Sequence, residues 1–196
     1  CSSAVTAFPD KPIRIIVPFS PGGGTDLVAR TISEGMSREL GQSVVVENRP
    51  GAGTTIGTDF VVKSPADGYT LLLATFAQAV NPSLIKNLPY NASRDLIPVA
   101  MVGNSPNVLV VPSQSPFQSV ADVITYAQKF PGKLTYASQG NGTSAHLAGE
   151  LFISLTKVDM VHIPYKGASQ AITDVLGGQV QMTFATASAA ANLVRG

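Results

Sequence analysis

Hydrophobic and polar positions follow two alternating periods along the first part of the chain. The apolar runs at residues 13–17, 44–46 and 71–74 are β-branched or leucine-rich and bounded by turn residues, which predicts buried strands. Between them, residues 27–40 and 56–63 carry apolar side chains at helical spacing, which predicts amphipathic helices. Because strands that alternate with helices form βαβ units, the pattern predicts a parallel sheet with helices on both faces.

The second half of the chain repeats this alternation after a change of texture. Two extended runs are expected at residues 96–102 and 107–111, separated by Gly103-Asn104-Ser105-Pro106, where we place the crossover between domains. Helices are expected at 119–129, 143–156 and 169–176, and strands at 134–137, 160–163 and 181–184. The chain is thus predicted to hold two α/β domains, residues 8–102 and 103–196, after a short leading segment of residues 1–7.

Composition and charge exclude two classes of protein. Charged residues make up 13% of the 196 positions, the formal net charge is +1, and no run of lysines or arginines occurs, so a nucleic-acid binder is not expected. The apolar runs are far shorter than the ~20 residues of a membrane-spanning helix. A chain of this length buries about 70% of its unfolded surface and needs no covalent staple.

Cys1 is the sole cysteine, so the chain can form neither an internal disulfide nor a thiolate metal cluster. Two well-separated histidines give no metal-binding spacing, and neither a metal nor another cofactor is expected. Residues 1–7 fit the end of a secretory signal, the start of a lipoprotein that carries its lipid on Cys1, or a remnant of cloning. The sequence leaves these three open, and export to the periplasm is the expectation.

A glycine-rich loop, Pro18 to Asp26, lies between the first predicted strand and the first predicted helix. Three consecutive glycines let a ligand approach the backbone, and Thr25 and Asp26 are expected as N-cap residues at the positive end of the helix dipole. The loop therefore suits a carboxylate or a phosphate. The alternatives are a plain tight turn and, for Asp26, a simple capping role.

A second glycine-rich loop, residues 138–144, follows the strand that ends at Ala137. One such loop in each domain predicts a cleft that closes on a small acid, with backbone amides from both sides donating to it; two ordinary strand-to-helix turns are the alternative. His146 could donate to the anion or pack, and His162 is expected to be structural. No nucleophile elbow surrounds the loop hydroxyls, so no catalytic residue is predicted.

Five segments in the same order resemble the signature segments of the Bug-type extracytoplasmic solute receptors of tripartite tricarboxylate transporters. They are residues 12–19, the Pro21-Gly22-Gly23-Gly24-Thr25-Asp26 loop, residues 47–53, residues 64–71 and Pro164-Tyr165-Lys166-Gly167. The resemblance runs from Phe8 to Gly196. Five separate segments make it far more specific than any one of them.

The resemblance implies a periplasmic, two-domain receptor of the Venus-flytrap type (type II), which captures a small organic carboxylate and delivers it to membrane permease subunits. It implies no enzymatic activity. The ligand-binding residues that it implies are Phe19, Gly23, Gly24, Thr25, Asp26, Thr75 and Ala77 in the first domain and Ser138, Gly140, Gly142, Thr143 and His146 in the second. Residues 165–167 are expected at the rim of the cleft.

The chain departs from the family pattern in two places. Where members usually carry an acidic residue after the last strand, residues 182–188 have none, which puts a side contact to the ligand in doubt. Members also continue for about another hundred residues, a typical domain's worth. We therefore expect the C-terminal part of the fold to be missing, with an unfinished first domain that could form a homodimer.

Two other functions stay open at this point. One is an α/β enzyme that binds a phosphorylated substrate at the Gly22–Gly24 loop, although the loop has neither the Gly-Lys-Ser/Thr ending of a nucleotide site nor the Gly-x-Gly-x-x-Gly fingerprint. The other is a ligand sensor subunit whose closed form is recognised by a partner protein. The same cleft would serve both.

Overall fold

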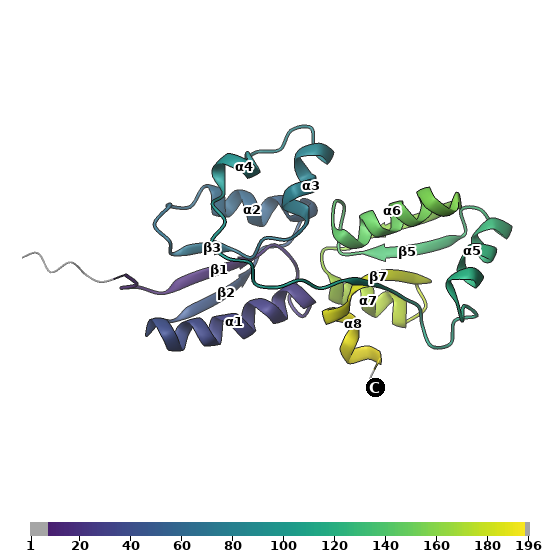
Figure 1. The fold of residues 1–196 in the computed structure, drawn as a ribbon, viewed down its shortest axis with the longest axis horizontal. Helices are drawn as coiled ribbons and strands as arrows, with labels where there is room; N and C mark the ends of the chain where they lie inside the picture. The colour runs from purple at the N-terminus through teal and green to yellow at the C-terminus, as the bar shows by residue number, and fades with distance from the viewer. Residues whose placement is uncertain (1–7, 195–196) are drawn as a thin grey trace, which may run out of the picture.

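The computed structural model describes residues 8–194, and the side chains of residues 8–191. The chain forms two α/β lobes that are joined by residues 96–106 (Figure 1). In the described part of the chain, no helix combines the length and the apolar character that crossing a membrane requires.

The first lobe is a parallel three-stranded sheet with helices on both faces. Its elements are β1 (Ile13–Val17), α1 (Gly24–Leu40), β2 (Val44–Asn48), the 3-10 turn η1 (Ala52–Thr54), α2 (Thr55–Val62), β3 (Thr70–Leu72), α3 (Ala77–Leu84) and α4 (Ala92–Asp95). The strand order is β2-β1-β3, so β1 is central and its side chains are almost fully buried. Helix α1 covers one face and α2 the other (Figure 1). The loop after β1 therefore leaves the sheet at its middle.

The second lobe is a mixed four-stranded sheet of order β4-β7-β5-β6. Its elements are β4 (Asn107–Val110), α5 (Val120–Lys129), β5 (Leu134–Ser138), α6 (Ser144–Thr156), β6 (Met160–Pro164), α7 (Ala168–Leu176), β7 (Met182–Thr186) and α8 (Ala187–Val194). Strands β5, β6 and β7 are parallel, whereas β4 pairs antiparallel with β7. The expectation of parallel strands is wrong for β4. This strand enters the lobe directly from the crossover at residues 96–106 and runs antiparallel to β7.

The hydrophobic periods predicted most of the elements and missed those without an apolar stripe. The strands and helices expected from residue 13 to 63 and from 107 to 184 are confirmed to within a few residues. The extended run expected at 96–102 is wrong as a strand: it pairs with nothing in the sheets, and Ile97, Val99 and Met101 are more than 80% exposed. Helices α3, with Pro82 inside it, and α8, built of small residues, were not predicted.

Candidate functional site

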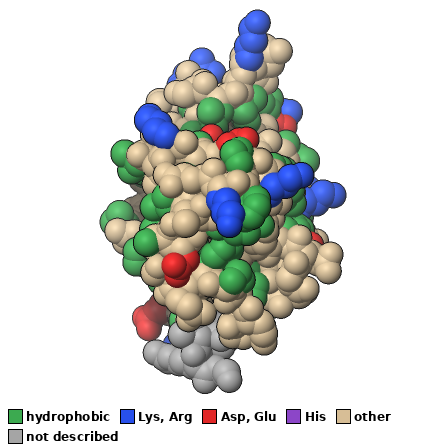
Figure 2. Space-filling view, turned by 90° about the vertical axis from the view of Figure 1, so that its right-hand side faces the viewer, with side chains coloured by type: hydrophobic (Ala, Val, Ile, Leu, Met, Phe, Trp, Pro, Cys, Tyr) green, Lys and Arg blue, Asp and Glu red, His purple; other side chains and the backbone are tan. Residues whose placement is uncertain are grey.

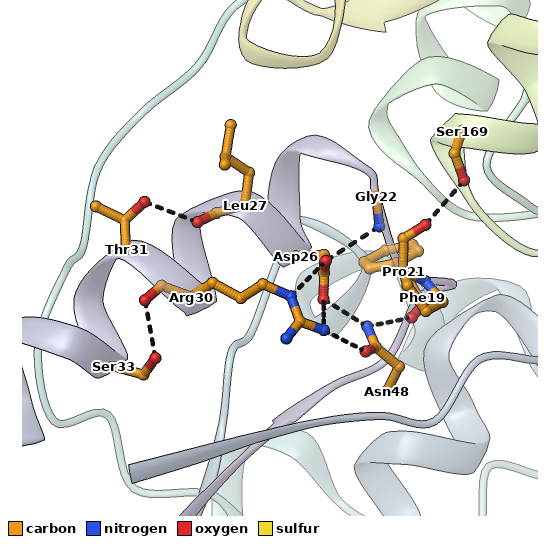
Figure 3. A network of polar contacts seen from close by, with 10 residues as sticks. All are labelled: Phe19, Pro21, Gly22, Asp26, Leu27, Arg30, Thr31, Ser33, Asn48 and Ser169. Atoms are coloured by element: carbon orange, nitrogen blue, oxygen red, sulfur yellow. Dashed lines mark hydrogen bonds and ion pairs between the residues drawn. The ribbon is translucent and has the colours of Figure 1, made fainter.

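The C-terminal ends of the parallel strands of both lobes point at the space between the lobes, and the loops that follow them meet there. The amide and hydroxyl of Ser20 both donate to the carbonyl of Lys166, each at 3.2 Å. Ser169 Oγ donates to the carbonyl of Pro21 at 3.0 Å (Figure 3). The structure is therefore a closed arrangement in which the loop after β1 bonds to residues 166–169 of the second lobe.

The Asp26 carboxylate bonds the first glycine-rich loop to the start of α1 and to β2. Its Oδ2 accepts from the Gly22 amide at 3.0 Å and from Arg30 Nε at 2.9 Å, and its Oδ1 accepts from Arg30 Nη2 at 3.1 Å and Asn48 Nδ2 at 2.8 Å (Figure 3). Asn48 Nδ2 also donates to the carbonyl of Phe19 at 3.1 Å. Four N–H groups of the protein donate to this buried carboxylate, and one of them is the Gly22 amide of the loop. Asp26 therefore holds the loop in place.

The N-cap of α1 is Gly23, so the expectation that Thr25 or Asp26 caps the helix is wrong. Asp26 lies in the first turn and accepts from the Gly22 amide, one residue before the N-cap, whereas the acid of a capping box accepts from the N-cap amide itself. Burial opposes ionisation of Asp26, but hydrogen bonds from Arg30, Gly22 and Asn48 outweigh it and lower the pKa of the carboxyl below 3.8. The carboxylate is therefore charged at neutral pH.

The glycines of the first loop face the second lobe closely in this closed arrangement. A Cβ added to Gly23 would lie 3.4 Å from the Cβ of Ala168, and one added to Gly24 would lie 2.5 Å from Ser188 Oγ. Ser188 and Thr186 belong to the segment that lacks the family's acidic residue. The first loop therefore contacts the starts of α7 and α8 in this closed arrangement.

The second glycine-rich loop is held by its own hydroxyls. Ser138 Oγ accepts from the Gly140 amide at 3.0 Å, and Thr143 Oγ1 donates to the carbonyl of Gly140 at 2.6 Å. Ser138 and Thr143 are 0% and 2% exposed, so neither hydroxyl reaches the cleft. Gly140 has a φ of 127° and Gly142 a φ of 75°, values that favour glycine. The hydroxyls predicted as ligand contacts thus shape the turn.

A stack of aromatic rings supports this second loop. His146 Nδ1 accepts from the Gly142 amide at 3.1 Å, and its ring stacks on His162 at 4.3 Å between centroids. His162 stacks in turn on Tyr136, and its Nε2 lies 2.6 Å from Ser138 Oγ. Burial, helped by His146, lowers the pKa of His162 to about 4, so the ring is neutral at pH 7. One ring nitrogen of His146 is therefore bonded to the loop. His162 has the structural role that the sequence predicted.

A cavity of about 430 Å³ lies between the lobes beside the second loop. It is lined by Ala52, Gly53, Asn81, Leu84 and Ile85 of the first lobe and by Gly140, Asn141, Pro164 and Tyr165 of the second. This is within the range of small-molecule sites. Among the described residues, no lysine or arginine lines it.

The helices that begin at this cleft keep their first amides free of side-chain caps. The N-caps of α1, α6 and α7 are Gly23, Thr143 and Gly167, and none accepts an amide on its side chain. Helices α2 and α3 also lack side-chain caps, but the amides of Thr55, Gln78 and Ala79 donate to backbone carbonyls. By contrast, α4 and α5 begin away from the strand ends and are capped by Asn91 and Ser119. Since the first turns of helices carry unpaired N–H groups and a positive dipole end, the cleft can hold an anion.

The predicted site residues all belong to segments that meet between the lobes, but few line the cavity. Of the twelve, each within the described chain, Gly140 alone does so. Phe19 packs its ring in the core of the first lobe, and Ala77 is 0% exposed at the start of α3. The carbonyl of Thr75 accepts a hydrogen bond from the Gln78 amide. The sequence did not predict that the turn at residues 51–54 and Asn81 line the cavity. The only signal for this turn was that residues 47–53 form one of the five segments of the family resemblance.

Charge does not mark the site. Figure 2 shows the outer end of the second lobe, where basic side chains stand apart among hydrophobic and acidic ones. Arg30 pairs with Asp26, the carboxylate that bonds the first glycine-rich loop. In the described part of the chain, no cluster of three or more His, Cys, Asp or Glu side chains could hold a metal ion.

Comparison with known proteins gives matches over nearly the whole chain. The profile of the tripartite tricarboxylate transporter family receptor matches residues 28–196. The protein BugT of Bordetella pertussis is 46% identical over 175 residues, which are 88% of this chain and 54% of that protein. The chain spans about half the length of the curated relatives it matches.

Two solved structures of Rhodopseudomonas palustris proteins match as folds. One, solved with adipate, is 36% identical with a TM-score of 0.92, and the match covers 96% of this chain and 63% of that one. The other, MatC with bound malate, is 32% identical with a TM-score of 0.88, covering 96% and 64%. The two-lobed periplasmic-binding-protein fold predicted from the sequence is confirmed, and this chain covers 64% and 63% of two of the solved structures that share it.

Proposed function

The chain belongs to the tripartite tricarboxylate transporter family receptors, and from this premise we propose that it binds a small organic carboxylate between its two lobes as an extracytoplasmic solute receptor. The observation that carries the proposal is the set of uncapped helix N-termini at the cleft. Their free amides and dipoles supply positive potential where no cationic side chain lines the cavity.

The related structures support the choice of ligand class. One was solved with adipate and one with malate, both carboxylates, and we extend the class to this chain. Charge-assisted hydrogen bonds from backbone amides are about twice as strong as neutral ones, so a few suffice to fix a carboxylate. The cavity between the lobes leaves room for the rest of the molecule.

The twelve predicted residues then divide into three roles in this proposal. Gly23, Gly24, Thr25, Gly140 and Gly142 belong to the backbone that approaches the ligand. Asp26, Thr143 and His146 hold that backbone in shape through the hydrogen bonds described above. Phe19, Thr75, Ala77 and Ser138 place the ends of the strands from which the loops leave.

We propose no enzymatic activity. Ser138 and His162 form a close hydroxyl–imidazole pair, but Ser138 is 0% exposed and its hydroxyl accepts from the Gly140 amide, so it cannot reach a substrate. A phosphorylated substrate would also suit uncapped helix N-termini. The binding experiment below separates the two anions.

Titration of the full chain with carboxylates tests the proposal. Adipate, malate and succinate are compared with inorganic phosphate and a sugar phosphate, with thermal unfolding as the readout. A ligand at about 100 times its Kd stabilises the native state by about 2.7 kcal/mol. The midpoint should then rise by about 5–10 °C for a chain of this size. If only the phosphates raise the unfolding midpoint, the receptor proposal is wrong and the enzyme that binds a phosphorylated substrate is favoured.

The other predictions from the sequence stay proposals. They are a domain boundary between residues 102 and 103, periplasmic localisation, delivery to membrane permease subunits, and a homodimer through the first lobe. The signal remnant and the lipid on Cys1 fall on residues 1–7, outside the described residues. Co-purification of a tagged chain with membrane proteins, in the presence and absence of the bound acid, tests the permease partner and also the ligand-sensor alternative.

A further inference from the structure

Asn81 is a polar side chain at the interlobe cavity that is only half satisfied. It is 1% exposed, and its Nδ2 donates to the carbonyl of Gly53 at 2.9 Å and to Thr54 Oγ1 at 3.2 Å. Its Oδ1 is buried and accepts no hydrogen bond within the described chain. Buried polar atoms in folded proteins are nearly always paired, so this oxygen calls for a donor.

The orientation of the Asn81 amide is fixed by its neighbours. Rotating the amide by half a turn would place Oδ1 against the carbonyl oxygen of Gly53, and two acceptors repel. The oxygen therefore faces the second lobe, where it would lie 2.9 Å from a Cβ built on Gly142. The Gly142 amide cannot serve as its donor, because that amide already donates to His146 Nδ1.

Asn81 lines the interlobe cavity, so a ligand that enters this cavity is a source from which the donor can come. An ionised carboxylate offers no hydrogen, so the acidic ends of a ligand cannot satisfy Oδ1 and are repelled by it. A hydroxyl or amino group on the carbon chain of the ligand can satisfy it. Asn81 thus differs from the helix N-termini, which attract the carboxylates of any acid.

We propose that Asn81 is the residue that selects the ligand, and that the receptor prefers a dicarboxylate bearing a hydroxyl or amino group to the plain dicarboxylate of the same length. The inference rests on the proposed function and deepens it. Sites built to hydrogen-bond a ligand group reject analogues that lack the group, because a buried polar atom is then left unpaired. The expected preference is about tenfold or more.

Calorimetric titration of the full chain with matched pairs tests this. The pairs are malate against succinate and 2-hydroxyglutarate against glutarate, with aspartate as the amino analogue of succinate. The wild type should bind the substituted acid of at least one pair about tenfold or more tightly. Replacement Asn81→Ala should bring that ratio close to one, with most of the loss on the substituted acid.

Two further variants keep the test decisive. Asn81→Asp retains the acceptor oxygen and loses the Nδ2 donor, so both acids should weaken while their ratio survives. Gln78→Ala removes another amide from the same helix, one bonded to Thr58 Oγ1 at 2.8 Å and away from the cavity lining, and should leave the ratio unchanged. Circular dichroism of each variant confirms that it is folded.

Each outcome separates the inference from the proposed function. If the wild type binds both members of each pair equally, or if Asn81→Ala leaves a tenfold ratio intact, the selection role is wrong while carboxylate binding stands. If none of the acids binds, the proposed function fails and the inference fails with it.

Discussion

Single residues at the cleft show how far local sequence carries the interpretation. Asp26 and Arg30 form an i,i+4 ion pair on α1 at 2.9 Å, which was not predicted from the sequence. The amide of Asn48, 22 positions away, completes the network only once β1 and β2 have paired. The sequence therefore located Asp26 correctly but could not assign its partners.

Replacing Asp26 with asparagine should destabilise the first lobe by about 2 kcal/mol, since a charged acceptor of several hydrogen bonds is lost. Because the folded-state pKa lies below 3.8, this contribution is fully present above about pH 4 and disappears as pH falls further. Urea unfolding at pH 7 measures the loss. The control Asp67→Asn, at an exposed ion pair with Lys11, should cost clearly less, and equal costs would contradict the role of Asp26.

Replacing Gly23 with valine should weaken carboxylate binding by about tenfold or more without unfolding the chain. Gly23 has a φ of −84°, which any residue adopts, but the added methyls would push against Ala168 and hold the lobes apart. The control Gly35→Ala fills open space inside α1 and should stabilise the chain by about 0.5–1 kcal/mol with unchanged affinity. Wild-type affinity for Gly23→Val would show that close approach at this loop is not needed.

Elements were predicted well where an apolar stripe or a buried run marks them. Helix α5 carries such a stripe and a capping Ser119, and both were read from the sequence. Helix α3 has a proline and polar residues, and its place is set by packing of Ala77 and Asn81 against the lobe. Because α3 was missed, the cavity-lining Asn81 was missed with it.

The ring stack between β5, β6 and α6 should make stability depend on pH. His162 has a pKa of about 4 in the folded state against 6.5 ordinarily, so the unfolded state binds the extra proton between these values. Stability is complete above about pH 6.5 and falls as pH drops toward 4. Glu150, His146 and Tyr136 are the titratable groups that face the ring.

Thermal unfolding midpoints measured from pH 4 to pH 7.5 check this dependence. The variant His162→Gln should show a flatter curve over that range, whatever its absolute stability. An identical slope in wild type and variant would mean that His162 does not carry the effect.

The whole molecule is where sequence reasoning stopped short. Two α/β lobes and their cleft followed from the pattern and the resemblance, and they are confirmed. The contacts across the cleft were not predicted: Gly53 lies against Asn141 of the second glycine-rich loop, and Gly24 lies against Ser188. Such contacts depend on the angle between lobes, which no local period encodes.

The crossover between the lobes exposes apolar side chains that should promote association. Ile97, Val99 and Met101 are 86%, 83% and 88% exposed. Light scattering after size exclusion should show concentration-dependent dimers of this chain, and the triple replacement by serine should reduce them. Association unaffected by the triple variant would place the dimer contact elsewhere.

A co-crystal structure of the full chain with malate tests the central claim most directly. The account predicts a carboxylate between the lobes with its oxygens about 2.7–3.2 Å from backbone nitrogens in the first turns of α1, α6 or α7, and no lysine or arginine side chain paired with it. A malate held by a cationic side chain, or bound outside the interlobe space, would contradict the claim that free helix amides bind the acid.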